Sequence, residues 1–277
     1  IVGEAPLTIA VEHWGWRQTI ITLGIAGVIL ALLVWLIVRD SPEAVSKGHR
    51  FQATSKKTIL QSFHQVAANS QTWFIALYSF MVWAPITAFA ALWGVPFLVV
   101  AYGISTKAAS TACTMIWLAI GIGFPLLGWW SDKVNLRRMP LKFAASLGVF
   151  GLVPVIYMPH LPLLWLYVCL FLFGLAASGQ SLAFGVVKDN NHSSVAGTAI
   201  GINNMATVAG GALFQPIIGI LLHLNWNGVY SNGTPFYSVE NYRKAFIVLP
   251  FCYLIAFLIG KFLIRETHCQ QQPDVAK

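Results

Sequence analysis

The stretch GWWSDKVNLRRMP, residues 128–140, decides the fold, because it is a short charged segment between two long apolar runs. These runs cover residues 105–127 and 141–158. Each is close to the roughly 20 residues that an α-helix needs to cross a bilayer. Basic residues stay on the cytoplasmic side of a membrane because they resist translocation during insertion. The sequence therefore predicts two membrane helices joined by a tight cytoplasmic turn.

The composition extends this interpretation to the whole chain. Of its 277 residues, 57% are hydrophobic and only 9% are charged, whereas a soluble domain averages about 25% charged residues. So few charges could not cover the surface of a soluble domain of this size. The net charge of +8 comes from basic residues at the ends of apolar runs, so we expect no nucleic-acid partner. The sequence predicts an all-α, multi-pass integral membrane protein that is embedded in the lipid bilayer.

Seven apolar runs are long enough to span a bilayer. They cover residues 18–38, 72–100, 105–130, 141–158, 161–187, 195–224 and 245–264. If the 128–140 loop is cytoplasmic, all Lys and Arg residues fall on that side except Arg17, Lys107, Arg243 and Lys244. This bias predicts a cytoplasmic C-terminus.

The charged loop resembles a motif of the major facilitator superfamily (MFS) of secondary transporters. That motif reads Gly-x-x-x-Asp-(Arg/Lys)-x-Gly-x-(Arg/Lys)-(Arg/Lys), and its counterparts here are Gly128, Asp132, Lys133, Arg137 and Arg138. In that family the loop occurs twice in a twelve-span protein, between the second and third helices of each half. The resemblance implies a gating loop. The carboxylate of Asp132 would pair with the basic residues, cap a neighbouring helix N-terminus and hold the cytoplasmic side shut.

Two positions of the loop depart from the motif. Asn135 replaces the usual Gly, and Leu136 replaces a residue that is often basic. Asn is the non-Gly residue that best tolerates a positive φ, so we expect the turn to form. Leu136 removes one charge and weakens the match. The alternative is a generic basic loop, which every multi-span protein has.

The resemblance also implies a division of the chain. A Gly-Trp-Arg triplet at residues 15–17 resembles the start of the sixth helix of the family. Residues 1–38 would then end the N-terminal half with one span, and residues 39–71 would form the central cytoplasmic loop. We expect a helix on the membrane surface or a solvated linker within that loop. Residues 72–265 would form the C-terminal six-helix domain, and residues 266–277 a cytoplasmic tail. The missing N-terminal half would be the partner of this chain.

Polar and helix-breaking residues inside the runs mark candidate positions along a solute pathway. Pro85 and Pro96 predict a kinked or broken second span. Non-helical backbone at membrane depth is tolerated only against protein or a water-filled cavity. Gly197 and Gly201 in the sixth span predict close helix packing. The candidate pathway residues are Trp83, Thr87, Trp93, Trp117, Gln180, Asn203, Asn204 and Gln215. The alternative is that these side chains only form hydrogen bonds between helices.

Charged residues are absent from the middle of every apolar run. Such residues commonly form proton relays inside membranes, so a coupling proton or sodium ion would bind elsewhere in the protein. The histidines lie in loops or at run ends, and the cysteines lack metal-ligand spacing. We therefore expect no enzyme, no metal and no cofactor.

The resemblance implies a secondary active, alternating-access carrier, for example a symporter, in a bacterial inner (plasma) membrane. Its expected cargo is a small polar solute, such as an organic acid, a sugar or an amino acid. The alternative is a sensor or receptor with the same fold, or a non-functional fragment, neither of which transports.

Overall fold

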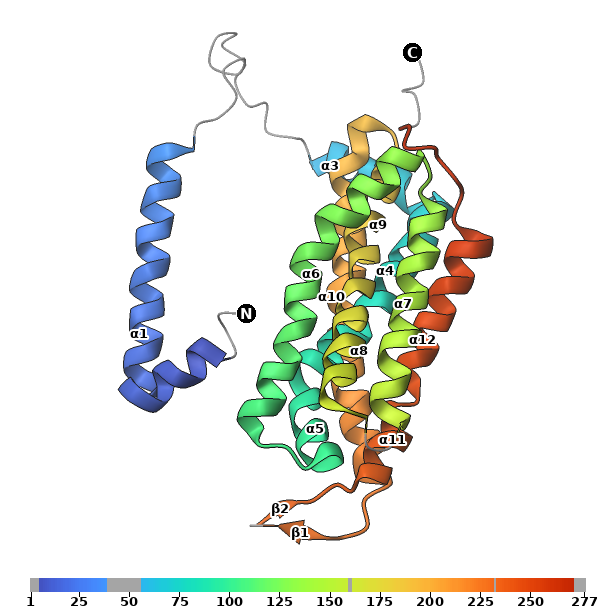
Figure 1. Cartoon of the computed structure of the whole chain (residues 1–277). Coiled ribbons are helices and arrows are strands. Elements are labelled where there is room, and N and C mark those ends of the chain that lie inside the picture. Colours follow the sequence, from blue (N-terminus) through green and yellow to red (C-terminus); the bar gives the residue numbers. More distant parts are fainter. Residues whose placement is uncertain (1–4, 39–55, 159–160, 232, 272–277) are drawn as a thin grey trace, which may run out of the picture. The chain divides into compact units, whose positions relative to one another are not determined.

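The computed structural model describes residues 5–38, 56–158, 161–231 and 233–271. The chain divides into two compact units, Ile1–Gln61 and Ser62–Lys277. Within the described ranges, seven helical segments are long and apolar enough to cross a membrane (Figure 1): His13–Ile37, Ser70–Tyr102, Thr106–Val134, Arg138–Tyr157, Leu163–Asp189, Ser193–Leu224 and Val239–Leu263. The seven predicted spans are thereby confirmed as helices.

The first unit contains α1, Ala5–Ile37. This helix begins well before residue 18, where the sequence predicted the span to begin, because it continues through a kink at Gly15. That residue has a φ of 78° and a ψ of 157°, which a residue with a Cβ would resist. After the kink the apolar side chains are exposed within their unit, with Trp35 at 77%. A helix that is apolar on all sides suits a lipid environment.

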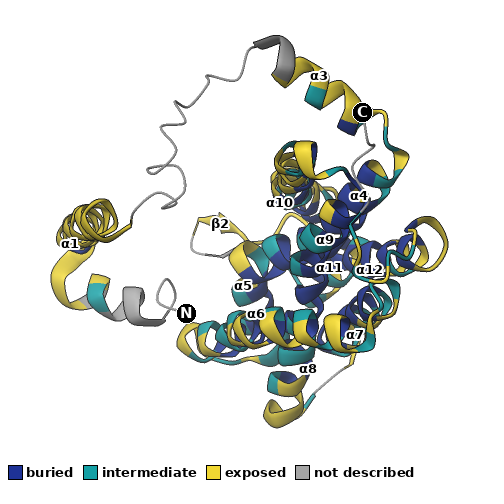
Figure 2. Ribbon diagram, turned by 90° about the horizontal axis from the view of Figure 1, so that it is seen from above, coloured by how far each residue is buried: buried dark blue, intermediate teal, exposed yellow. Residues whose placement is uncertain are grey.

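The second unit is a helical bundle (Figures 1 and 2). Neighbouring pairs of helices form three of its spans. The bundle helices are α4 (Ser70–Ala88) with α5 (Gly94–Tyr102), α6 (Thr106–Val134), α7 (Arg138–Tyr157), α8 (Leu163–Ala176) with α9 (Ser178–Asp189), α10 (Ala196–Leu224), and α11 (Val239–Phe246) with α12 (Val248–Leu258). Helix α10 packs along α4, α6 and α7 both pack on α8, and α12 packs on α7 and α4.

Shorter elements complete the described part of the chain. Helix α3, Lys56–Ala67, confirms the prediction that residues 39–71 contain a helix. Its position at a membrane surface stays a prediction. A 3₁₀ turn at Ser193–Val195 leads into α10. Beyond α10, strand β1 (Tyr230–Ser231) pairs antiparallel with β2 (Thr234–Pro235). A π-helical segment, Ile259–Leu263, follows α12.

The second span changes helical geometry, as its prolines predicted. Helix α4 contains Pro85, and a π-helical turn, Phe89–Trp93, separates it from α5. Such turns appear mostly as local bulges, often at functional sites. A Cβ on Gly94 would lie 2.7 Å from the carbonyl oxygen of Phe89, so this turn requires glycine. Pro96 lies in the first turn of α5, where a missing donor is tolerated, and α5 continues past it.

Glycines also set how closely some helices approach. A Cβ on Gly151 of α7 would lie 2.5 Å from the backbone nitrogen of Phe173 in α8, and one on Gly210 of α10 would lie 2.9 Å from a carbonyl oxygen of α4. The packing predicted for Gly197 and Gly201 is wrong within the bundle. Both are exposed, and nothing lies within 4 Å of a Cβ added there, because they lie on a face of α10 that no described helix of the bundle covers.

Candidate functional site

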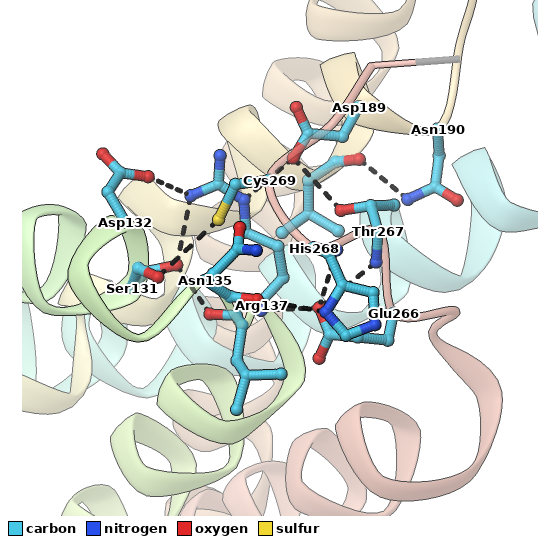
Figure 3. A network of polar contacts seen from close by, with 12 residues as sticks. Ser131, Asp132, Asn135, Arg137, Asp189, Asn190, Glu266, Thr267, His268 and Cys269 are labelled. Carbon is cyan, nitrogen blue, oxygen red and sulfur yellow. Dashed lines mark hydrogen bonds and ion pairs between the residues drawn. The ribbon is translucent and has the colours of Figure 1, made fainter.

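The charged loop is built by the end of α6, the three connecting residues 135–137 and the start of α7 (Figure 3). Asn135 ends α6 in the left-handed region with a φ of 54°, which confirms the prediction that Asn could replace the usual Gly. The hydroxyl of Ser131 donates to the carbonyl oxygen of Leu136, 2.8 Å away. These two features bring the side chain of Arg137 back towards the last turn of α6.

Arg137 is the centre of the loop. Its Nη1 donates to Asp132 Oδ1 at 2.9 Å and to Ser131 Oγ at 3.1 Å. Its Nε donates to Asp189 Oδ2, at the end of α9, over 2.8 Å. The side chains of Arg137 and Asp189 are 11% and 8% exposed, whereas that of Asp132 is 66% exposed. The buried ion pair of this loop is therefore Arg137–Asp189, and the pair with Asp132 is a surface contact.

The charges around Arg137 keep its guanidinium protonated. Burial alone would lower its pKa, but the hydrogen bond with Asp189 and the charge of that carboxylate outweigh burial and raise the pKa above its usual value. Charged hydrogen bonds of this kind are shorter and stronger than neutral ones. The pair fixes the end of α9 against the start of α7.

Glu266, just after the last span, caps helix α7. Its Oε1 accepts from the backbone nitrogen of Arg137 at 2.7 Å, and its Oε2 accepts from that of Arg138 at 2.9 Å. A carboxylate at a helix N-terminus satisfies free N–H groups and complements the helix dipole. Burial would raise the pKa of Glu266, but these backbone N–H groups and those of His268 and Thr267 lower it. Glu266 is therefore the carboxylate that caps α7, and the capping of a neighbouring helix N-terminus by Asp132 stays a prediction.

The segment after the last span is fastened to the charged loop (Figure 3). Thr267 Oγ1 donates to Asp189 Oδ2 at 3.2 Å. His268 Nδ1 lies 3.2 Å from the carbonyl oxygen of Asn135, and Cys269 Sγ lies 3.6 Å from that of Ser131. The first residues of the predicted cytoplasmic tail thus belong to the loop network. Residues 272–277 of that tail lie outside the described residues.

The other motif residues have separate partners. The Nε of Arg138 donates to the carbonyl oxygen of Gly260 at 3.3 Å, and its Nη2 donates to that of Lys261. The ammonium of Lys133 lies 4.8 Å from the ring centroid of Trp129. Nothing lies within 4 Å of a Cβ added to Gly128, so no contact within the described bundle requires glycine there.

Sequence reasoning missed Asp189 and Glu266. Each is an acidic residue directly after a basic one, Lys188 and Arg265, at the end of an apolar run. That pattern at two run ends on the side of the charged loop was the available signal. Sequence alone could not show that both carboxylates converge on one arginine.

Four of the pathway candidates meet or adjoin between α4 and α10. The Nε2 of Gln215 donates to the carbonyl oxygen of Thr87 at 3.0 Å, and Trp93 Nε1 donates to the carbonyl oxygen of Gln215 at 3.2 Å. The hydroxyl of Thr87 donates to the carbonyl oxygens of Trp83 and Ala84. We name Trp83, Thr87, Trp93 and Gln215 the α4–α10 polar cluster. All four are half-buried and lie beside the π turn.

The remaining candidates are placed differently. Asn203 is fully buried, where its Oδ1 accepts from Ser79 Oγ at 2.8 Å and its Nδ2 has no hydrogen-bond partner among the described residues. Its neighbour Asn204 is exposed. Gln180 is 6% exposed on α9, and Trp117 is half-buried on α6. Within the described ranges, no group of three or more His, Cys, Asp or Glu could hold a metal ion.

The fold and the charged loop define a multi-pass helical membrane protein. The family model described as Major Facilitator Superfamily matches residues 5–215 and, in a second overlapping match, residues 86–273. The chain belongs to this family.

Several curated proteins are similar to the chain. It is 24% identical to Membrane sensor protein UhpC of Escherichia coli, covering 87% of this chain and 58% of that protein. It is 24% identical to a Probable hexose phosphate transport protein of Chlamydia muridarum (80% and 54% covered) and 26% identical to the Glycerol-3-phosphate transporter of Bacillus subtilis (77% and 52%). The chain thus spans little more than half the length of the curated relatives it matches.

A solved structure supports the fold. It is the crystal structure of a bacterial homologue of the human lysosomal transporter Spinster, in an inward-facing and unoccupied conformation. The TM-score is 0.56 at 15% sequence identity, over 94% of this chain and 61% of that one. At this identity the likeness concerns the fold alone.

Proposed function

We propose that the chain belongs to a secondary carrier that moves a small polar solute across a membrane by alternating access. The observation that carries this proposal is the α4–α10 polar cluster, which lies where the second span changes from α to π geometry. Broken membrane helices commonly form the substrate sites of secondary transporters. Membership of the Major Facilitator Superfamily supports the same class of function.

The cluster favours a solute rich in hydroxyl groups, such as a sugar. It offers an amide, two indoles and a hydroxyl, all neutral groups. The curated relatives include proteins named for hexose phosphate and glycerol 3-phosphate. A phosphate ester would need a cation near its phosphate, and the spans carry Lys and Arg only towards their ends. For such a solute, the cation would come from the ends of the described spans or from outside them.

The coupling ion and the orientation are also proposals. The described spans have no carboxylate at mid-depth, so we place the site of a coupling proton or sodium ion outside them. The excess of Lys and Arg around the charged loop supports a cytoplasmic position for that loop and for the C-terminus, in a bacterial inner membrane. The N-terminal half that would complete the pathway stays a prediction.

A second candidate function is sensing without transport. Two relatives, at 24% and 25% identity, are named Membrane sensor protein UhpC. A sensor of this fold would bind the solute through the same polar cluster but would not exchange it across the membrane.

Counterflow in proteoliposomes distinguishes the two functions. The natural full-length protein is reconstituted with unlabelled solute inside, and the entry of the labelled solute is measured for glucose, glucose 6-phosphate and glycerol 3-phosphate. A carrier exchanges at least one solute, and Gln215→Ala lowers that exchange severalfold. Gln61→Ala, a substitution at an exposed residue of α3, leaves it unchanged. Solute binding without exchange would support the sensor. Normal exchange by the Gln215→Ala protein would show that the α4–α10 polar cluster takes no part in solute exchange.

A further inference from the structure

An apolar groove runs between α6 and α7 on the outside of the bundle. Its volume is about 300 Å³, and its walls include Leu126 and Trp129 of α6 and Phe143 and Leu147 of α7. Its floor is formed by Leu175 of α8 and Ser178 of α9. We name this feature the α6–α7 groove. The side chains of Leu126, Trp129 and Phe143 are each about half exposed within the bundle, at 53%, 59% and 47%.

The packing of three helices explains the groove. Helices α6 and α7 both pack mainly on α8 rather than on each other (Figure 1), so a space remains between them above α8. Gly123 deepens it, because the absence of a Cβ lets Ser178 approach α6; an added Cβ would lie 2.1 Å from the serine Oγ. Trp130 and Phe143, which both line the groove, meet edge to face at 5.2 Å.

A cation lies at the mouth of the groove. The ammonium of Lys133 is 4.8 Å from the ring centroid of Trp129, which is itself a wall of the groove. The adjacent carboxylate of Asp132 pairs with Arg137. Lys133 is exposed and, among the residues that the structure describes, forms no ion pair with a carboxylate. An apolar groove thus ends beside an unneutralised ammonium.

We propose that the α6–α7 groove binds an anionic phospholipid, with an acyl chain along the groove and the headgroup phosphate beside Lys133. An apolar cavity of roughly 150 Å³ holds a benzene molecule, so this groove has room for a stretch of acyl chain. Trp and Lys side chains at the end of a membrane helix lie at headgroup depth, where basic residues attract anionic lipids. This inference depends on the membrane fold and not on the proposed transport.

The charge at the mouth is tested by lipid competition. The natural full-length protein is placed in nanodiscs of equal parts phosphatidylglycerol and phosphatidylcholine, then released and examined by native mass spectrometry for retained lipid. The proposal predicts that phosphatidylglycerol is retained severalfold over phosphatidylcholine. Lys133→Gln should abolish this preference, whereas Lys188→Gln, an equal charge change at an exposed lysine near the end of α9, should keep it. No preference in the unaltered protein, or equal effects of the two variants, would overturn the proposal.

The apolar part is tested by filling the groove. Leu126→Trp places a larger side chain in the wall and should lower the retention of both lipids severalfold. Leu118→Trp, also on α6 and 39% exposed but not part of the groove, should leave retention unchanged. Thermal melting of each variant shows whether it folds. Unchanged lipid retention by a folded Leu126→Trp protein would show that the lipid binds elsewhere and would overturn the assignment of the groove.

Discussion

Asp189, and not Asp132, should be the carboxylate on which the stability of the charged loop depends. Both pair with Arg137, at 2.8 Å and 2.9 Å. Asp189 and Arg137 are almost fully buried, whereas Asp132 is 66% exposed. Breaking a buried pair by removing one partner costs about 3–5 kcal/mol, because an uncompensated charge stays buried. An exposed pair contributes about 1 kcal/mol or less.

The expected magnitudes follow from this difference in exposure. Asp189→Asn should cost about 3 kcal/mol, the lower end of the range, because Asp132 still neutralises part of the charge on Arg137. Asp132→Asn should cost less than about 1 kcal/mol. For a domain of this size, each kcal/mol lost from the free energy of unfolding lowers the melting temperature by roughly 2–4 °C. The first variant should therefore melt roughly 6–12 °C lower, and the second within about 4 °C of the unaltered protein.

Thermal melting of the detergent-solubilised protein, followed by tryptophan fluorescence, measures both variants. The double variant Arg137→Met with Asp189→Leu is the informative control. It removes both buried charges, so it should recover much of the stability that Asp189→Asn loses. Equal losses for Asp189→Asn and Asp132→Asn, or a larger loss for Asp132→Asn, would refute the assignment of the buried pair.

Three further predictions concern single residues. Glu266→Ala should destabilise the protein by about 1 kcal/mol through loss of the α7 cap. Folding lowers the pKa of this carboxyl. The contribution of Glu266 to stability is therefore present above the unfolded pKa of about 4.3 and is lost as the pH falls through the folded pKa. A pH series of melting temperatures checks this, and a loss that is equal at all pH values would contradict it. Asn135→Val should cost about 1–2 kcal/mol at its φ of 54°, whereas Asn135→Gly should be tolerated; equal melting temperatures would contradict the strain. Gly94→Ala should lower transport or solute binding more than Gly128→Ala, because an added Cβ would meet Phe89; a solute-binding assay showing no difference would contradict a role for the π turn.

The fold could be predicted because it depends on local patterns. Seven long apolar runs, the charged loop and the two prolines of the second span are each visible in the sequence, and each has its counterpart in a helix, a turn or a π segment. Asn135 is a further example, because its tolerance of a positive φ is a property of the residue itself.

The partners of the charged loop could not be predicted, because they come from distant parts of the chain. Arg137 meets Asp189, 52 positions away, and its backbone meets Glu266, 129 positions away. Only the bundle brings the ends of α9 and of the last span to the start of α7. The candidate pathway divides in the same way. The polarity of Asn203 and Asn204 is visible in the sequence, but only the packing of α10 on α4 shows that the first is buried and the second exposed.

The accessibility of Gln215 shows most directly whether the α4–α10 polar cluster lines a solute pathway. Cys269, the one described cysteine that is not buried, is replaced by Ser, and single cysteines are placed at Gln215 and Asn203. Their labelling by a water-soluble thiol reagent is measured with and without the exchanged solute. We expect the solute to slow labelling at position 215, while position 203 stays protected in this conformation. Equal labelling of position 215 with and without solute, or its protection in every condition, would show that the cluster does not line a solute pathway.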